Sequence, residues 1–191
     1  MKESTNDEKI GVSVICNTYN HEKYIAKTLN SILEQRTEFV IEVLVHDDAS
    51  TDKTADIIKE YADKYPDTIK LIKQKNQGPG STVNSGISNA TGKYFKMVDG
   101  DDWVETDNLK RLIEELKKTD ADMILTNYEI YDNKQEKIIE TVKVKIPENE
   151  IFKMEDIGSK LNIQMHNVTY KTQILKDYNI RLDKGFYTDM E

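Results

Sequence analysis

The chain has 191 residues, a length that suits one domain. Its 35 acidic residues outnumber its 27 basic residues and give a net charge of −8, which argues against a nucleic-acid partner because such binding needs a basic surface. The single cysteine, Cys16, excludes an internal disulfide and a cysteine-based zinc site, so we expect a reducing, cytoplasmic location.

The chain begins with a polar stretch, residues 1–10, that predicts a disordered tail and lacks the apolar core of a signal peptide. Strand-like apolar runs then alternate with segments whose apolar residues recur at helical spacing. The predicted elements are strands at 11–17, 40–45, 69–72 and 94–98, with helices at 22–35, 51–65, 81–89 and 106–118. No segment approaches the ~20 apolar residues that span a bilayer.

The second half of the chain is less regular. Residues 123–130 predict a fifth strand, and the alternating charged and apolar residues of 134–145 predict an exposed strand or hairpin. A short helix, a strand at 164–170 and a helix at 171–177 are expected to follow. No linker divides the chain, so we expect one domain over 11–191.

Strands that alternate with helices every ~25–30 residues are typical of right-handed βαβ crossovers. We therefore predict an α/β fold with a Rossmann-like, mostly parallel central sheet and helices on both faces. Ligands of such sheets bind beyond the carboxyl ends of the strands. Three polar groups follow predicted strands there, namely Thr18, Tyr19 and Asn20, then Asp47, Asp48 and Ser50, then Asp99, Asp101 and Asp102.

The last of these groups, Asp99, Asp101 and Asp102, is an acidic turn whose carboxylates repel one another unless a cation joins them. Oxygen ligands of this kind suit Mg²⁺ or Mn²⁺, which would let an anionic substrate enter. Gly100 permits a close approach of the backbone. The alternative is a solvated acidic turn that caps the next helix.

Asp47 and Asp48 leave a similar choice open. They either cap the following helix, which Ser50 and Thr51 could also do, or accept a hydrogen bond from a nucleotide base or ribose. Tyr19 either stacks on a flat base or packs at the rim of the fold.

Several familiar sites are absent from the sequence. It contains neither a P-loop nor the glycine pattern of dinucleotide-binding folds, and Trp103 occupies a ligand position of an EF-hand. The three histidines lack the helical spacing of a metal pair. His166 is a candidate cleft residue, and a structural role is its equal alternative.

Four segments resemble family 2 glycosyltransferases of the GT-A fold, in the order in which that family carries them. They are VSVICNTYNHEKYIAKTLNSILEQ from Val12 to Gln35, VLVHDDASTDKT from Val43 to Thr54, the stretch from Asn76 to Trp103 with Asn84, Gly86, Ala90, Gly92 and VDGDDW, and FYTDME from Phe186 to Glu191. The similarity is dense over 11–103 and looser over 160–191, and it indicates a bacterial member of the family.

The resemblance implies an inverting enzyme that uses a nucleotide-diphosphate sugar, with a UDP-sugar as the default donor and Mn²⁺ or Mg²⁺ as cofactor. Tyr19 would stack on the base and Asp48 would bind its N–H. Asp101 and Asp102 would hold the metal, and Asp189 would be the general base. The full set of nucleotide-binding candidates is Thr18, Tyr19, Asn20, Asp47, Asp48, Asp99 and Gly100.

On this resemblance, residues 11–103 form the nucleotide-sugar half and 104–191 the acceptor-side half of one GT-A domain. The chain ends soon after Asp189, whereas family members continue, so we expect a truncated chain with an incomplete acceptor side. The expected partners are a nucleotide-sugar donor and a glycan or lipid-linked acceptor of cell-surface polysaccharide synthesis. Attachment to the inner face of the membrane would come only through the missing part.

Three other functions stay open. A metal-dependent phosphatase of the haloacid-dehalogenase type also carries Asp-x-Asp after an apolar strand, although after the first strand rather than the fourth. A sugar-phosphate nucleotidyltransferase normally opens with a glycine-rich loop and a basic residue, which the segment Asn17 to His21 lacks. A non-catalytic module would bind a nucleotide-sugar without using Asp189 as a base.

Overall fold

The computed structural model describes residues 11–34, 40–148, 150–157, 161 and 163–183, and the tail predicted for 1–10 lies outside them. Strands and helices alternate through the first half of the chain, as the sequence predicts. The elements are β1 (Val12–Thr18), α1 (Ile25–Leu33), β2 (Ile41–Asp47), α2 (Thr54–Lys64), β3 (Ile69–Lys73), α3 (Pro79–Asn89), β4 (Tyr94–Met97), α4 (Thr106–Lys118), β5 (Met123–Leu125), β6 (Tyr128–Asp132), β7 (Lys137–Val142), α5 (Met154–Ile157), the 3₁₀ turn η2 (Met165–Asn167), β8 (Val168–Lys171) and α6 (Thr172–Asp177).

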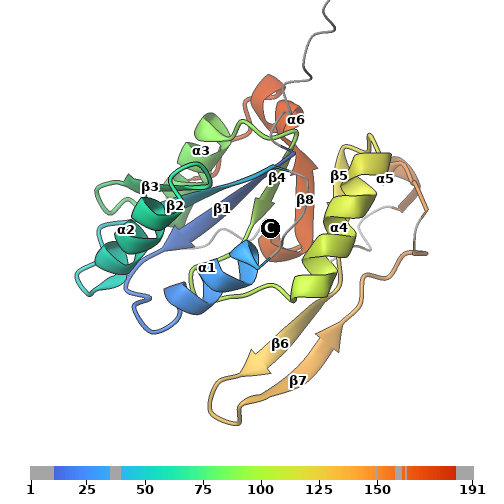
Figure 1. Cartoon of the computed structure of the whole chain (residues 1–191). Coiled ribbons are helices and arrows are strands. Elements are labelled where there is room, and N and C mark those ends of the chain that lie inside the picture. Colours follow the sequence, from blue (N-terminus) through green and yellow to red (C-terminus); the bar gives the residue numbers. More distant parts are fainter. Residues whose placement is uncertain (1–10, 35–39, 149, 158–160, 162, 184–191) are drawn as a thin grey trace, which may run out of the picture.

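A six-stranded sheet in the order β3-β2-β1-β4-β8-β5 forms the centre of the fold (Figure 1). β1 lies between β2 and β4, and the pairs among β3, β2, β1 and β4 are parallel. β8 runs antiparallel to both of its neighbours, β4 and β5. The predicted α/β fold with a mostly parallel sheet is confirmed, with β8 as the strand that runs the other way.

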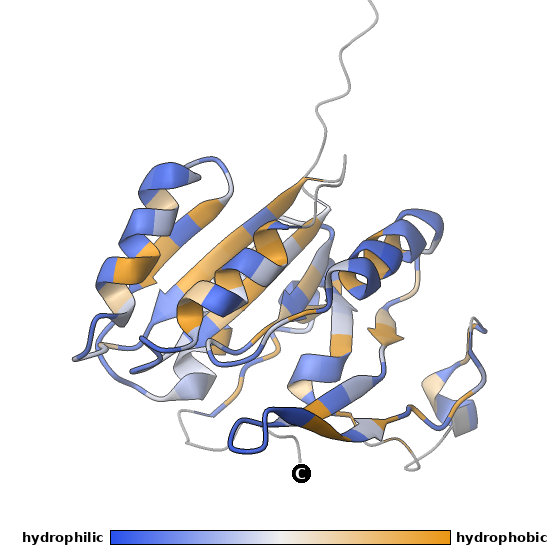
Figure 2. Ribbon diagram, turned by 60° about the horizontal axis from the view of Figure 1, so that its bottom comes forward, coloured by the Kyte–Doolittle hydropathy of each residue, from blue (hydrophilic) through white to orange (hydrophobic). Residues whose placement is uncertain are grey.

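Helices cover both faces of this sheet, because its inner strands carry apolar side chains on both sides. On one face, α1, α2 and α4 bury Leu29, Ile58 and Ile113 against the strands. On the other face, α3 and α6 bury Ile87 and Leu175. Figure 2 shows the result, with apolar strands inside the fold and hydrophilic outer surfaces on the helices.

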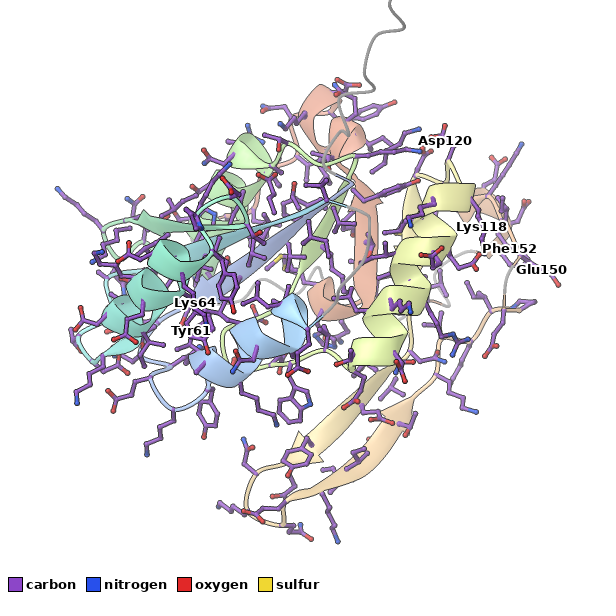
Figure 3. The ribbon with its side chains drawn as sticks, viewed as in Figure 1. Tyr61, Lys64, Lys118, Asp120, Glu150 and Phe152 are labelled. Atoms are coloured by element: carbon purple, nitrogen blue, oxygen red, sulfur yellow. The ribbon has the colours of Figure 1, made fainter. Side chains whose placement is uncertain are left out.

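A hydrogen bond joins α1 to α2 on the first of these faces. The hydroxyl of Tyr61 donates to Asn30 Oδ1 at 2.9 Å. Figure 3 shows Tyr61 on the side of α2 that lies next to α1. This bond holds α1 and α2 together on that face of the sheet.

The single strand predicted for 123–130 is wrong, because the chain leaves the main sheet after β5. Asn127 turns its side chain to the end of β7, where Oδ1 accepts a hydrogen bond from Val144 N at 2.8 Å. β6 then pairs with β7 in a separate, antiparallel two-stranded sheet. The exposed strand or hairpin predicted for 134–145 is found as β7, and Figure 1 shows the hairpin projecting from the main sheet.

Several helices begin at residues other than those expected, and α1 starts at Ile25 rather than at 22. α3 starts at Pro79 rather than at 81, since the fixed φ and missing N–H of proline suit the first turn of a helix. α2 starts at Thr54 rather than near 51, because Asp52 Oδ1 accepts from Thr54 N at 2.9 Å and holds the preceding turn outside the helix.

The helices in the described ranges are short, and none of them is long and apolar enough to cross a lipid bilayer. The longest, α4, has 13 residues. A membrane-spanning helix needs ~20 residues.

Candidate functional site

The carboxyl ends of β1, β2 and β4 meet at one edge of the sheet, and two backbone hydrogen bonds join them. Asp48 N donates to Thr18 O at 3.0 Å, and Gly100 N donates to Asn17 O at 2.8 Å. Thr18 also pairs with Asp47 in the register of β1 and β2. The structure therefore brings together the polar groups that follow these three strands.

The turn after β4 packs so closely against the end of β1 that position 100 has room only for glycine. A Cβ atom there would lie 2.7 Å from Thr18 Oγ1 and 2.8 Å from His21 Nδ1. Asn17 Oδ1 and Thr18 Oγ1 are buried and have no hydrogen-bond partner within the described part of the chain. Buried polar atoms are normally paired, so these two atoms are candidate contacts for a ligand.

The acidic turn carries negative charge that its surroundings only partly balance. The Asp101 side chain is 52% exposed, and its Oδ1 lies 3.9 Å from His21 Nδ1. Although Asp102 reaches the surface, loss of water around its carboxyl group raises its pKa, and the Asp101 carboxylate raises it further. The pKa of Asp102 is lowered by His166 and His21, which oppose these two effects. A bound cation would relieve the repulsion.

The residues of this turn suit a cation that binds together with a phosphate ligand. Among residues 11–34, 40–148, 150–157, 161 and 163–183, no group of three or more His, Cys, Asp or Glu side chains is arranged to hold a metal ion. Mg²⁺ in proteins typically takes one or two carboxylates and completes its oxygen shell with water and substrate phosphates. Asp101 and Asp102 can supply two such carboxylates.

Two hydroxyl groups of α1 hold the backbone of the acidic turn. Thr28 Oγ1 lies 2.6 Å from Asp102 O and 3.1 Å from Gly100 O. Ser31 Oγ accepts from Val104 N at 3.2 Å and donates to Thr28 O at 2.8 Å. Sequence reasoning missed both residues, and the signal was a pair of hydroxyl residues, three apart, among the apolar positions of a predicted amphipathic helix.

Asp48 is buried and holds the loop between β3 and α3. Its Oδ1 accepts from Gln74 Nε2 at 2.7 Å and from Gln77 N at 3.1 Å. Its Oδ2 accepts from Gly78 N at 3.0 Å. Since a carboxylate offers about four acceptor positions, Asp48 keeps about one of them for a ligand.

Neither Asp47 nor Asp48 caps α2, so that alternative is wrong. Asp47 Oδ1 accepts from Ser50 N at 3.1 Å and closes the turn after β2. The first N–H of α2, that of Thr54, is bonded to Asp52 instead.

The loop after β1 presents the Tyr19 ring at the surface, where it is 45% exposed. The next residue, Asn20, has a φ of 58°, a conformation that asparagine tolerates better than most residues. Asn20 Oδ1 accepts from Thr51 N at 2.8 Å, and Asn20 N donates to Ser50 Oγ at 3.0 Å. Asn20 thus joins the loops after β1 and β2, and the neighbouring Tyr19 ring is open to a stacked ligand.

His166 lies just before β8, close enough to the acidic turn to influence the pKa of Asp102. Its ring packs edge-on against Tyr128, with the ring centroids 4.5 Å apart. Its backbone oxygen accepts from Lys96 Nζ at 3.0 Å. Lys96 is 5% exposed, and burial lowers the pKa of its amine to about 8. The structure therefore places this candidate cleft residue beside the turn.

Asp99 is half-buried at the start of the acidic turn, where its backbone oxygen accepts from Asp102 N at 3.0 Å. Asp189, the predicted general base, lies outside the described residues. Sequence reasoning also missed three side chains that contact predicted site residues. They are His21, Gln74 and Lys96, and only Lys96 carried a signal, as a charge inside an apolar strand.

Comparisons with known proteins agree with this arrangement. The family model described as Glycosyl transferase family 2 matches residues 13–179. Glycosyltransferase GlyA of Streptococcus pneumoniae is 32% identical over 192 residues, which cover 94% of this chain and 26% of GlyA. The poly(ribitol-phosphate) beta-N-acetylglucosaminyltransferase TarS of Staphylococcus aureus is 37% identical over 116 residues, which cover 59% of this chain and 20% of TarS.

A solved structure shares the fold over nearly the whole chain. The crystal structure of S. aureus TarS 1–349 in complex with UDP-GlcNAc matches with a TM-score of 0.70 and 25% sequence identity, covering 94% of this chain and 50% of that one. This chain therefore spans about half of the crystallised TarS chain and about a quarter or less of the two curated relatives.

Proposed function

Because the chain belongs to glycosyl transferase family 2, we propose that it forms the donor-binding part of an enzyme that transfers a sugar from a nucleotide-diphosphate sugar to an acceptor hydroxyl. The observation that carries the proposal is the meeting of three polar strand ends, one of them acidic, at one edge of the sheet. Membership of the family disfavours the phosphatase and nucleotidyltransferase alternatives.

The proposed donor is a UDP-sugar, which the complex of TarS with UDP-GlcNAc supports. The proposed acceptor is a glycan or lipid-linked sugar of a cell-surface polymer, which the poly(ribitol-phosphate) in the name of TarS supports. The enzyme would act at the cytoplasmic side of the membrane, where nucleotide-sugars are made.

The nucleotide is proposed to bind across the ends of β1 and β2. Its base stacks on the exposed ring of Tyr19 and donates its N–H to the remaining acceptor position of Asp48. The buried Thr18 Oγ1 and the carboxylate of Asp99 are proposed to bind the ribose. Asn20, Asp47 and Gly100 contribute by fixing the loops around the nucleotide, which the hydrogen bonds of Asn20 and Asp47 support.

The diphosphate is proposed to bind at Asp101 and Asp102, together with Mn²⁺ or Mg²⁺. When bound, the cation neutralises the negative charge that builds on the leaving diphosphate. The chain itself contributes two carboxylates on a backbone that Thr28 holds by its hydroxyl group. Burial raises the pKa of Asp102 most, and the Asp101 carboxylate raises it further; that repulsion between the two carboxylates supports a cation between them.

The transfer step is proposed to use Asp189 as a general base. Asp189 takes the proton of the acceptor hydroxyl, and the acceptor oxygen attacks C1 of the sugar from the face opposite the diphosphate. The bond between C1 and the diphosphate oxygen breaks as the new bond forms, and the nucleoside diphosphate leaves with the electron pair. One such displacement inverts the configuration at C1.

Isothermal titration of the chain with UDP, with and without Mn²⁺, tests the donor site. We expect binding in the presence of Mn²⁺, and at least about tenfold weaker binding by Asp101→Asn. Glu105→Gln removes an exposed carboxylate just outside the acidic turn and should bind like the wild type. Absence of heat with UDP, GDP and TDP in the presence of either cation would contradict the proposed function. Binding of UDP without release of UDP from any UDP-sugar would favour the non-catalytic module.

A further inference from the structure

A groove lies between α1 and the segment that joins the acidic turn to α4, and the proposed function makes no use of it. Its volume is about 540 Å³, which is within the range of sites that hold small molecules. Its lining consists of Lys27, Asn30, Ser31 and Glu34 on α1 and of Trp103, Val104, Glu105 and Thr106 on the other side.

Two contacts across the groove join its walls. Lys27 Nζ lies 3.0 Å from the centroid of the Trp103 ring, so the ammonium group sits over one face of the indole. Three to four residues further along α1, Ser31 Oγ accepts from Val104 N at 3.2 Å. The folded chain therefore forms this groove by itself, as is usual for small-molecule sites.

The polar side chains of the groove supply both donors and acceptors of hydrogen bonds. Asn30 Oδ1 already accepts a hydrogen bond from α2, which leaves the amide N–H groups as donors. Glu105 precedes the first turn of α4 without capping it, so its carboxylate is an acceptor. Glu34 Oε2 accepts from Thr106 Oγ1 at 3.3 Å and keeps further acceptor positions.

An indole ring beside donors and acceptors suits a sugar ring. A pyranose carries C–H groups on its faces and hydroxyl groups around its rim, and each hydroxyl both donates and accepts. The indole offers an apolar body to such a face. The charges disfavour an anion, because Glu34 and Glu105 outnumber Lys27 and the acidic turn directly precedes Trp103. An apolar ligand would leave the polar lining unpaired.

We propose that this groove binds a neutral sugar unit of the acceptor glycan, a unit other than the one whose hydroxyl reacts. The inference rests on the proposed function, which supplies the acceptor. Trp103 directly follows Asp102, and Thr28, whose hydroxyl donates to Asp102 O, lies one helical turn before Ser31. The groove therefore adjoins the proposed metal site, and a glycan of a few units can reach both.

The fluorescence of Trp103 tests the proposal, because this residue is the only tryptophan of the chain. The sugar probes are the methyl glycosides of glucose, galactose and N-acetylglucosamine, and the disaccharides cellobiose, lactose and chitobiose. Ribitol 5-phosphate is the anionic probe without a sugar ring. Calorimetry with UDP and Mn²⁺ reports separately on the donor site.

The titrations compare Glu105→Ala and Lys27→Met, which each remove a charged group from the groove, with Glu115→Ala. Glu115 is an exposed carboxylate near the far end of α4, where it pairs with Lys118. We expect at least one sugar probe to change the Trp103 emission to saturation. Glu105→Ala and Lys27→Met should weaken its binding about 10-fold, because each removes a hydrogen bond to a charged group. Glu115→Ala should bind the sugar like the wild type, and all three variants should keep their UDP affinity.

The outcomes separate this inference from the proposed function. Binding of UDP with Mn²⁺ but of none of the sugar probes overturns the inference alone, as does a response to ribitol 5-phosphate in their place. Equal weakening by Glu115→Ala and Glu105→Ala would place the sugar elsewhere and overturn it too. A chain that binds none of UDP, GDP and TDP overturns the proposed function, and the acceptor role of the groove with it.

Discussion

The strands under the candidate donor site and the hairpin of β6 and β7 are built in different ways. β1 is buried along its whole length and β2 along nearly all of it, and each lies between two other strands. β7 is exposed at five of its six positions and is paired with β6 in a sheet of two strands. Packing therefore holds the strands under the donor site from every direction, whereas few contacts hold the hairpin.

Aromatic rings connect the hairpin to the donor side. Tyr131 of β6 packs edge-on against Trp103, with ring centroids 4.9 Å apart. Lys27 Nζ of α1 lies 3.0 Å from the centroid of the Trp103 ring. Because Trp103 directly follows the acidic turn, the hairpin is anchored next to the proposed metal site although its tip stands clear of the sheet (Figure 1).

The largest difference between the two regions should appear in the free energy of unfolding. Ile15 of β1 is fully buried, whereas Ile139 of β7 is 53% exposed. Ile15→Ala should destabilise the protein by about 2–5 kcal/mol, because it leaves a cavity under α3. Ile139→Ala should change stability by no more than about 0.5 kcal/mol. Denaturant unfolding measures both, and equal losses would remove the contrast between the regions.

A pH effect of intermediate size should arise from His46 on β2. This side chain is fully buried, neither ring nitrogen has a hydrogen-bond partner among the described residues, and burial lowers its pKa to about 4. Since the unfolded chain takes up the proton near pH 6.5, the folded protein should lose stability as the pH falls from 6.5 to 4.

The slope expected from His46 alone is about 1.4 kcal/mol per pH unit within that range. His46→Leu should flatten the dependence of unfolding free energy on pH, as measured by urea titrations between pH 4 and 7. If unfolding free energy depended on pH as steeply in His46→Leu as in the wild type, groups other than His46 would cause the loss of stability in acid.

The smallest of these effects concerns two hydroxyl groups, that of Thr28 beside the acidic turn and that of Thr141 on the hairpin. Thr28→Val removes the bond to Asp102 O and should cost about 1 kcal/mol of stability. It should also weaken Mn²⁺-dependent binding of UDP by several-fold, up to about 10-fold, because the acidic turn loses its support. Thr28→Ser should restore both properties.

Thr141→Val on β7 is the matched control, since its hydroxyl is exposed and lies 3.5 Å from Glu129. Thermal melting and calorimetry with UDP and Mn²⁺ measure the two variants under the same conditions. If Thr141→Val weakened UDP binding as much as Thr28→Val, the hydroxyl on α1 would have no special role at the turn.

Local patterns in the sequence predicted the donor-side half well. Apolar runs located β1 to β4. The rule that ligands of open sheets bind beyond the carboxyl ends of the strands predicted that Thr18, Asp48 and Asp101 lie at one edge. The prediction failed where distant residues decide the structure. Where the chain leaves the main sheet, Asn127 Oδ1 accepts a hydrogen bond from Val144 N, and no local sequence pattern indicates such a distant partner.

The candidate site, like the fold, could be predicted only in part. Residue types and strand ends identified the carboxylates, whereas the groups that hold them in place lie elsewhere in the chain. Gln74 reaches Asp48 from the loop between β3 and α3, and Thr28 reaches Asp102 from α1. Such supports depend on tertiary packing, so they become visible only when the fold is known.

The insertion of β8 between β4 and β5 has a consequence for the synthesis of the chain. In the described residues, β5 reaches the main sheet through β8, which is made much later. Pairings between distant segments form slowly, and an unpaired strand edge is open to other chains. While the ribosome makes the intervening residues, the edge of β4 that faces away from β1 has no partner strand. We therefore expect a nascent chain that ends before β8 to aggregate or to recruit chaperones.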